Sequence, residues 1–237
     1  MIKRIKNRAL VVGALAVLCL CGCSSDKQEE SQAEVKEENR AEDSSEEKVS
    51  MDSQIPYVLE DGKLEIRAVF QYSGINVDCK EEEGVDIGSV ELTNCSEEYL
   101  QELDLKLILS DDSELHFYIT DIPAGKTVWA FDTQNRTYSV SESIADAQTE
   151  VVFTNESDLM QQGMDVSVSG MEIEITNNMQ NDAENLSITC HTQLDGKYFG
   201  GISYTYPLDS LGAGVSAAIS AQDCLIGDAE VVRVAYE

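Results

Sequence analysis

The sequence has few basic residues for its acidity: 16 Lys and Arg stand against 45 Asp and Glu, a formal net charge of −29 at pH 7. A chain of this charge repels phosphate backbones, which excludes nucleic acid as a partner. Aromatic residues are scarce at 6%, yet 42% of the residues are hydrophobic, as in ordinary globular proteins. Patterned apolar residues begin only after residue 55, so we expect the folded part to begin there.

Motifs for catalysis are also lacking. The sequence contains no G-x-S-x-G, no H-E-x-x-H and no Gly-rich phosphate loop. His116 and His191 are the two histidines, and neither has an acidic or nucleophilic motif around it. No C-x-x-C follows the first 25 residues, which disfavours a zinc site. The sequence therefore predicts no enzyme, no metal and no cofactor, with a hydrolase left as an alternative.

The first 22 residues have the pattern of an export signal. Residues 1–8 carry four basic residues and no acidic one, and residues 9–20 form an unbroken apolar run. This run is shorter than the roughly 20 residues that a membrane-spanning helix needs. We therefore interpret this segment as a signal peptide.

The signal ends in Leu20-Cys21-Gly22-Cys23, which resembles the lipobox of bacterial lipoproteins. In that family a Leu three residues before a Cys, with a small residue directly before it, marks cleavage and lipid attachment. The resemblance implies that residues 1–22 are removed and that Cys23 carries a diacylglyceryl thioether, with acyl chains such as palmitate. It also implies attachment to the extracytoplasmic face of the cell membrane. The alternatives are a register that modifies Cys21, which would place the bulky Leu20 before the cleavage site, and a plain secretory signal.

Residues 23–54 are predicted to be a disordered acidic tether. The stretch after Cys23 holds eleven acidic and four basic residues and very few large apolar ones. Such a segment cannot bury enough apolar area to offset the entropy that ordering costs. A solvated helix is the alternative, because Glu, Gln, Lys and Ala are common here.

After residue 55, apolar residues recur at every second position, which predicts strands with one buried face. The clearest runs are Leu64–Tyr72, Leu103–Leu109 and Leu186–Cys190. Turn sequences such as Ser110–Ser113 and Asp195-Gly196 separate the runs, and 141–149 is expected to be a polar connection. The predicted fold class is all-β, with two tandem small antiparallel β-sandwich, immunoglobulin-like domains.

The two domains are predicted from an internal repeat. The sequence VELTN at 90–94 recurs as IEITN at 173–177, and EVV recurs at 150–152 and 230–232. The order of these matches indicates a duplication. We place the domains at 55–154 and 155–237, to within about ten residues. A different alignment would make Val152-Phe153 open the second domain.

A Thr-Asn strand end, an L-x-L strand and a Pro-Ala-Gly turn before the next strand follow one another in the first unit. This order resembles FxLYD-type and other immunoglobulin-like modules of bacterial surface lipoproteins. The chain departs from the FxLYD pattern after Leu107, where the aromatic-Tyr-Asp element is missing. The resemblance implies a role in binding or spacing.

The cysteines beyond Cys23 are candidates for disulfides, as expected of an exported chain. They are Cys79, Cys95, Cys190 and Cys224. Bonds within each repeat would join Cys79 to Cys95 and Cys190 to Cys224. Alternatively, Cys190 is an ordinary buried thiol, since it occupies the repeat position of Leu107.

Two acidic runs could bind calcium: Asp111, Asp112 and Glu114, and Glu81–Glu83. Neither has the ligand order of an EF-hand, so solvated turn acids are the alternative. We expect Trp129 to pack in the core. Tyrosines near Gly200-Gly201 would form either a contact surface or part of an inter-sheet core; they are Tyr198, Tyr204 and Tyr206.

The sequence therefore predicts a non-enzymatic, lipid-anchored bacterial surface protein. Its predicted partners are the membrane, through the lipid anchor, and a protein or cell-wall component, through the β-sandwich modules. A solute- or calcium-binding lipoprotein is the alternative.

Overall fold

The structure is a computed structural model, and it describes residues 55–79, 82–140, 144–155, 163–224 and 226–236. These residues form fourteen strands and two short 3₁₀ turns. The predicted all-β class is confirmed. Within these ranges no helix is long and apolar enough to cross a membrane. The predicted signal peptide, Cys23 and the tether lie outside the described residues.

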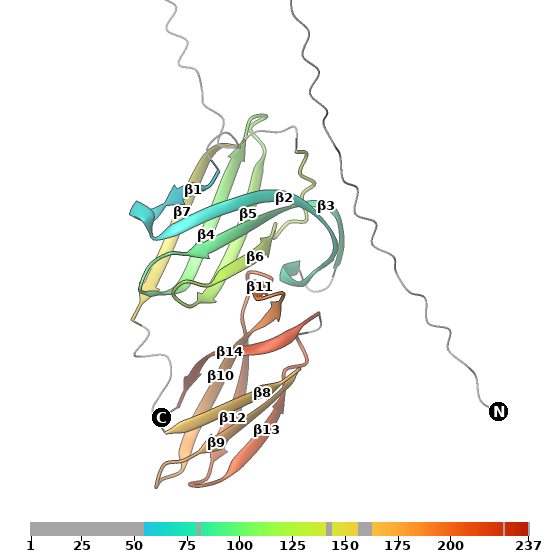
Figure 1. Cartoon of the computed structure of the whole chain (residues 1–237). Coiled ribbons are helices and arrows are strands. Elements are labelled where there is room, and N and C mark those ends of the chain that lie inside the picture. The colour runs from blue at the N-terminus through green and yellow to red at the C-terminus, as the bar shows by residue number, and fades with distance from the viewer. Residues whose placement is uncertain (1–54, 80–81, 141–143, 156–162, 225, 237) are drawn as a thin grey trace, which may run out of the picture. The chain divides into compact units, whose positions relative to one another are not determined.

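Two sheets face each other in the first half of the fold (Figure 1). The first contains β2 (Leu64–Asn76), β3 (Glu82–Asn94) and β6 (Thr127–Phe131), with the short β1 (Tyr57–Leu59) added to β2. The second contains β4 (Tyr99–Leu109), β5 (Glu114–Ile122) and β7 (Ile144–Thr154). The alternating Leu103, Leu105 and Leu107 of β4 are fully buried between these sheets, as their period of two predicts.

The second half repeats this strand pairing. One sheet contains β8 (Met164–Ser169), β9 (Glu172–Asn177) and β13 (Ser216–Ser220). The other contains β10 (Ala183–Leu194), β12 (Tyr204–Leu211) and β14 (Asp228–Ala235). Strand β9 lies between β8 and β13 as β3 lies between β2 and β6, and β10 lies between β12 and β14 as β4 lies between β5 and β7. The predicted division at 154–155 itself remains a prediction.

A buried asparagine closes the same turn in both halves. The Asn94 side chain donates to the carbonyls of Glu98 and Ile122, and its oxygen accepts from the Ser96 amide. The Asn177 side chain likewise donates to Asn181 and Leu211. Buried backbone groups need such partners, so the Thr-Asn motif that reveals the repeat in the sequence serves a structural purpose.

An additional strand, β11 (Lys197–Phe199), connects the two halves. It pairs antiparallel with β10 and parallel with β6, where Tyr198 lies opposite Val128 and Phe199 opposite Trp129. One eight-stranded sheet therefore contains strands from both halves. The sequence showed the turn before β11, but not its pairing with β6.

Two local expectations are wrong. The alternation over Leu64–Tyr72 predicts that Phe70 faces the core between the two sheets of the first half. A β-bulge between Ile66 and Ala68 shifts the register, so that Val69 packs against this core and Phe70 does not. Phe70 instead contacts Trp129 edge-on, on the opposite face of the sheet. Residues 144–149 belong to β7 and are not a polar connection.

The Thr-Asn turn yields a prediction about stability. In Asn177→Ala, the carbonyls of Asn181 and Leu211 and the amide of Met179 lose their partner. We expect the free energy of unfolding to fall by about 3 kcal/mol, because unsatisfied buried groups keep their desolvation cost. Denaturant unfolding measures this loss.

The matched control is Asn178→Ala, since the neighbouring Asn178 makes an exposed side-chain hydrogen bond to Asp165. It should cost less than about 1 kcal/mol. Equal losses in the two variants would contradict the role assigned to Asn177.

Candidate functional site

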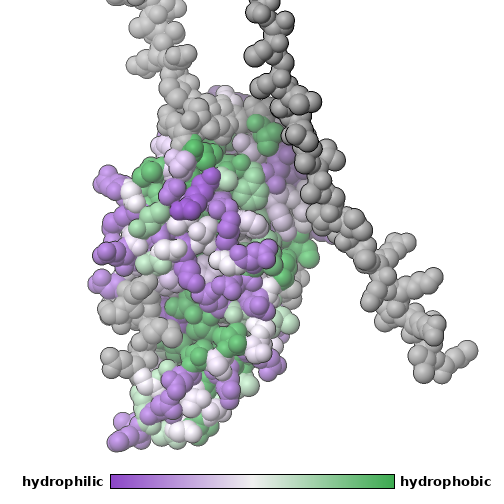
Figure 2. All heavy atoms as spheres, viewed as in Figure 1, coloured by the Kyte–Doolittle hydropathy of each residue, from purple (hydrophilic) through white to green (hydrophobic). Residues whose placement is uncertain are grey.

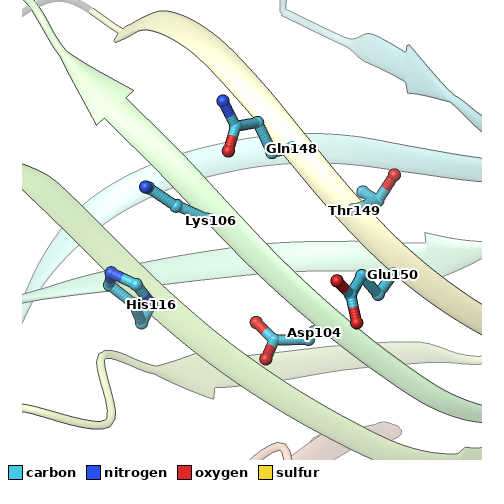
Figure 3. A pocket seen from close by; sticks show the side chains of 6 residues that line it. All are labelled: Asp104, Lys106, His116, Gln148, Thr149 and Glu150. Carbon is cyan, nitrogen blue, oxygen red and sulfur yellow. The ribbon is translucent and has the colours of Figure 1, made fainter.

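The outer face of the β5–β4–β7 sheet carries an open depression of about 440 Å³. Figure 3 shows the side chains that line it: Asp104, Lys106, His116, Gln148, Thr149 and Glu150. The pleat places Asp104 and Lys106 outward because Leu103, Leu105 and Leu107 point into the core. The depression is thus the polar side of an amphipathic sheet.

The two basic side chains in this depression both pair with the neighbouring Glu114. Lys106 Nζ lies 2.6 Å from Glu114 Oε1, and His116 Nε2 lies 3.1 Å from Glu114 Oε2. Hydrogen bonds from Lys106 and His116 lower the pKa of Glu114. Asp104 and Glu150 are cross-strand partners of like charge. Among the described residues, however, no group of three His, Cys, Asp or Glu side chains could hold a metal ion.

The two histidines have different surroundings, and the hydrogen bonds of their imidazole rings join neither ring to a hydroxyl or thiol. His116 pairs with Glu114 on the surface. His191 is fully buried, donates from Nε2 to the Thr120 carbonyl at 2.7 Å and stacks on the Tyr198 ring. Burial lowers the pKa of His191, so its imidazole is neutral. These two sites contain no pairing of nucleophile and base.

The most unusual polar group is the carboxylate of Asp78, next to β11. It accepts hydrogen bonds from the amides of Phe131 at 3.0 Å, Gly201 at 2.8 Å and Ile202 at 3.2 Å. Burial of the carboxylate raises the pKa of Asp78 to about 6, although these three amides act in the opposite direction. Part of the residue stays exposed, but its charged end is enclosed by backbone.

Gly200 and Gly201 allow the backbone to approach Asp78. Gly200 has a φ of +93°, and a Cβ there would lie 2.4 Å from a methyl carbon of Val77. A Cβ on Gly201 would lie 2.4 Å from the Tyr118 carbonyl oxygen. Only glycine fits both positions. The Gly-Gly pair was the one sequence signal of this contact, whereas nothing in the sequence distinguished Asp78 from the other acids.

A second buried carboxylate, Asp121, adjoins the same region. It accepts hydrogen bonds from the hydroxyls of Tyr99 at 2.9 Å and Ser203 at 2.6 Å, and Arg233 Nη2 lies 3.7 Å from it. Burial raises the pKa of Tyr99, so the phenol remains a donor. Strands from both halves thus meet around a hydrogen-bonded carboxylate, an arrangement that suits structural support more than chemistry. Two buried nitrogens nearby, Arg233 Nε and His191 Nδ1, have no hydrogen-bond partner among the described residues.

The structure brings one of the two predicted cysteine pairs together and keeps the other apart. Cys190 and Cys224 are both buried, and their sulfurs lie 3.8 Å apart. The hydrogen bond with Cys224 and burial raise the pKa of the Cys190 thiol. These two residues are close enough for the predicted disulfide to form after a small adjustment, and the bond remains a prediction.

Cys79 and Cys95 are not brought together. The Cys79 sulfur lies 2.9 Å from the Thr133 carbonyl, whereas Cys95 lies beside Glu65. Cys79 ends the 3₁₀ turn Val77–Cys79 after β2, and Cys95 directly follows β3. These antiparallel strands end at opposite ends of their shared ladder. A Cys79–Cys95 bond is therefore incompatible with this arrangement.

The calcium candidates are turn and surface acids where they are described. The Asp111 carboxylate accepts from the amide and hydroxyl of Ser113, and Glu114 is taken up by Lys106 and His116. Glu81 and the side chain of Glu82 lie outside the described residues.

The aromatic candidates do not form one surface. Tyr198 is buried in the core of the first half, and Tyr204 and Tyr206 pack against that of the second. Trp129 lies half-buried on the outer face of its sheet, where it packs against a small core cluster of Ile87, Phe131 and Phe199. Its Nε1 donates to Glu91 at 2.8 Å.

Neither the models of protein families nor the curated proteins contain a match to this chain.

The raised pKa of Asp78 predicts a pH dependence of stability. Between the ordinary carboxyl pKa near 3.8 and the folded value of about 6, the folded state holds a proton that the unfolded state has lost. The stabilisation from this proton is therefore present at low pH and lost as the pH rises through 6. The free energy of unfolding of the wild type, relative to Asp78→Asn, should fall by about 2.4 kcal/mol from about pH 4 to about pH 7.5.

Urea unfolding of both proteins at each pH measures this difference. Because all other titrating groups are shared, subtracting the two curves isolates Asp78. A difference that does not change with pH would contradict the burial of this carboxylate.

Proposed function

We propose that this protein is a lipid-anchored bacterial surface protein that acts outside the cytoplasm by contact and not by catalysis. The observation that carries the proposal is the sequence Leu20-Cys21-Gly22-Cys23 after a basic head and an apolar run. Two acyl chains on Cys23 would contribute on the order of 20 kcal/mol to membrane binding. The acidic segment 24–54 then holds the β-sandwich part away from the membrane.

The proposed contact role is supported by the architecture of the described residues. Repeated small sandwiches present edges, loops and flat faces, which suit protein recognition. The hydrogen bonds of the two imidazole rings connect neither ring to a nucleophile, and Lys106 and His116 in the depression on the β5–β4–β7 sheet already pair with Glu114. These features support a binding or spacing module more than a hydrolase.

Charge limits the kind of partner. Residues 55–237 contain 34 acidic and 8 basic residues. Six of the eight basic side chains, Lys63, Arg67, Lys106, Lys126, Lys197 and Arg233, already pair with carboxylates. On the face in Figure 2, hydrophilic residues are spread widely, with smaller apolar areas between them. Such a surface repels anionic wall polymers, so the proposal favours a protein partner with basic groups over a phosphate-rich polymer.

Lipid attachment at Cys23 is tested by labelling. Cells that express the full chain are grown with labelled palmitate and then fractionated. The wild type should carry label and pellet with membranes. Cys23→Ser should lose the label, because serine has no thiol to form the thioether.

Cys21→Ser is the matched control, and it should keep the label. Loss of label in Cys21→Ser with retention in Cys23→Ser would move the anchor to the alternative register. An unlabelled wild type would overturn the proposal.

A further inference from the structure

The edge of β13 has neither a charged residue nor a proline, two features that commonly protect a free sheet edge. Its residues, Ser216–Ser220, have the sequence SAAIS, with no charge and no proline. Every other described edge strand of at least five residues contains a charged residue or a proline, such as Pro207 in β12 and Asp146 in β7. An exposed edge without such residues is a template for pairing with another strand.

The equivalent edge in the first half already holds an added strand. Strand β6 corresponds to β13, and β11 lies along its outer side, where the Gly200 amide donates to the Trp129 carbonyl at 2.8 Å. Just before β6, the Lys126 carbonyl accepts from the Asn94 amide of β3, so Thr127, Trp129 and Phe131 direct their backbone groups to the opposite side, toward β11. The chain itself therefore shows how a strand binds to this edge.

The same alternation shows which backbone amides and carbonyls of β13 point away from β9. The Val215 carbonyl accepts from the Asn177 amide, so Val215, Ala217 and Ile219 direct their backbone groups toward β9. Ser216, Ala218 and Ser220 consequently direct theirs outward. No hydrogen bond from a described residue reaches this outer row.

A lysine fixes the added strand in the first half. Lys197 of β11 extends across Trp129, with Nζ 4.8 Å from the ring centre, and reaches Glu91 Oε2 of β3 at 2.7 Å. Glu91 lies opposite Trp129 in the ladder. The added strand thus combines backbone pairing with one ion pair across the edge strand.

The second half has a glutamate at the position equivalent to Glu91, but no described lysine pairs with it as Lys197 pairs with Glu91. Glu174 of β9 lies opposite Ala218 of β13, in the position that Glu91 takes opposite Trp129. Glu174 is exposed, and no described basic side chain pairs with it. The small Ala218 borders an open depression of about 260 Å³ that Glu172 and Glu174 also line. A long basic side chain could cross there.

The charge of the β8–β9–β13 sheet indicates which kind of segment could bind beside β13. The three strands of this sheet contain Asp165, Glu172 and Glu174 and no Lys or Arg. A second copy of this chain, with its net charge of −29, would be repelled. A cationic segment of a different protein would be attracted.

We propose that the β13 edge is a docking site for an extended, cationic segment of another protein. The segment adds beside β13 in the manner of β11 on β6, and its Lys or Arg crosses Ala218 to pair with Glu174. This inference rests on the contact role proposed above and specifies its surface and its partner chemistry.

The probe is a fluorescent, C-terminally amidated octapeptide with the sequence of residues 196–203, GKYFGGIS, whose one charged side chain is Lys197. It contains the strand that the chain places beside its own β6. Anisotropy is measured as full-length protein in detergent is added. The peptide should bind at least about tenfold more tightly than the same peptide with Lys197→Glu. Thermal unfolding of each protein variant confirms that it is folded.

Two variants test the site. Ala218→Pro removes an outward amide but leaves the ladder to β9 intact, and it should weaken binding at least about tenfold. Glu174→Lys should weaken the lysine peptide about tenfold and restore binding of the glutamate peptide, since the charges are exchanged. The control Glu184→Lys, at an exposed glutamate of β10, should change neither affinity by more than about twofold.

Failure to bind in the wild type, or binding that neither Ala218→Pro nor Glu174→Lys alters, would overturn the docking site. If Ala218→Pro unfolds, the charge exchange at Glu174 still decides the question. Palmitate labelling at Cys23 does not involve β13. A failure here alongside normal labelling would therefore refute the docking site and leave the proposed anchoring intact.

Discussion

A sheet edge exposes backbone amides and carbonyls. At the edge of β6, these groups form hydrogen bonds with the chain around β11 and with Asp78. Gly200 donates to the Trp129 carbonyl, and the Asp78 carboxylate accepts from Phe131, Gly201 and Ile202. This closure draws strands from both halves of the described chain into one sheet. It also depends on the close approach that two glycines permit. The cost of burying the carboxylate is offset by the amides that would otherwise lack partners.

The two halves share a common frame of paired strands and asparagine turns, and they differ at the edges of their sheets. The asparagine turn, the three-strand pairings and the glutamate of the E-[LI]-T-N motif occur in both. At β6 the frame carries Trp129 and an added strand, whereas at β13 it carries Ala218 and no strand from the described residues. The lipid attachment and the strand-accepting edge that we propose would together describe a protein that reaches from a membrane toward a basic partner.

Much of the frame was predictable from local pattern. Alternation identified the strand of Leu103, Leu105 and Leu107, and the Thr-Asn recurrence identified equivalent turns, because both signals come from residues adjacent in sequence. The bulge after Ile66 was not predictable, since its extra residue is defined only by the partner strand. The same holds for the candidate site. The contact of Asp78 with Gly201 joins residues far apart in the chain, and one acid among 45 carries no local signal.

The added strand β11 is tested most directly by amide hydrogen exchange at Gly200, Gly201 and Ile202. Their N–H groups are hydrogen-bonded to Trp129 or Asp78, so they should exchange as slowly as the amides of central strand β4. Exchange at the rate of an unprotected loop would contradict the closure of β6 and remove the template on which the β13 docking site is based.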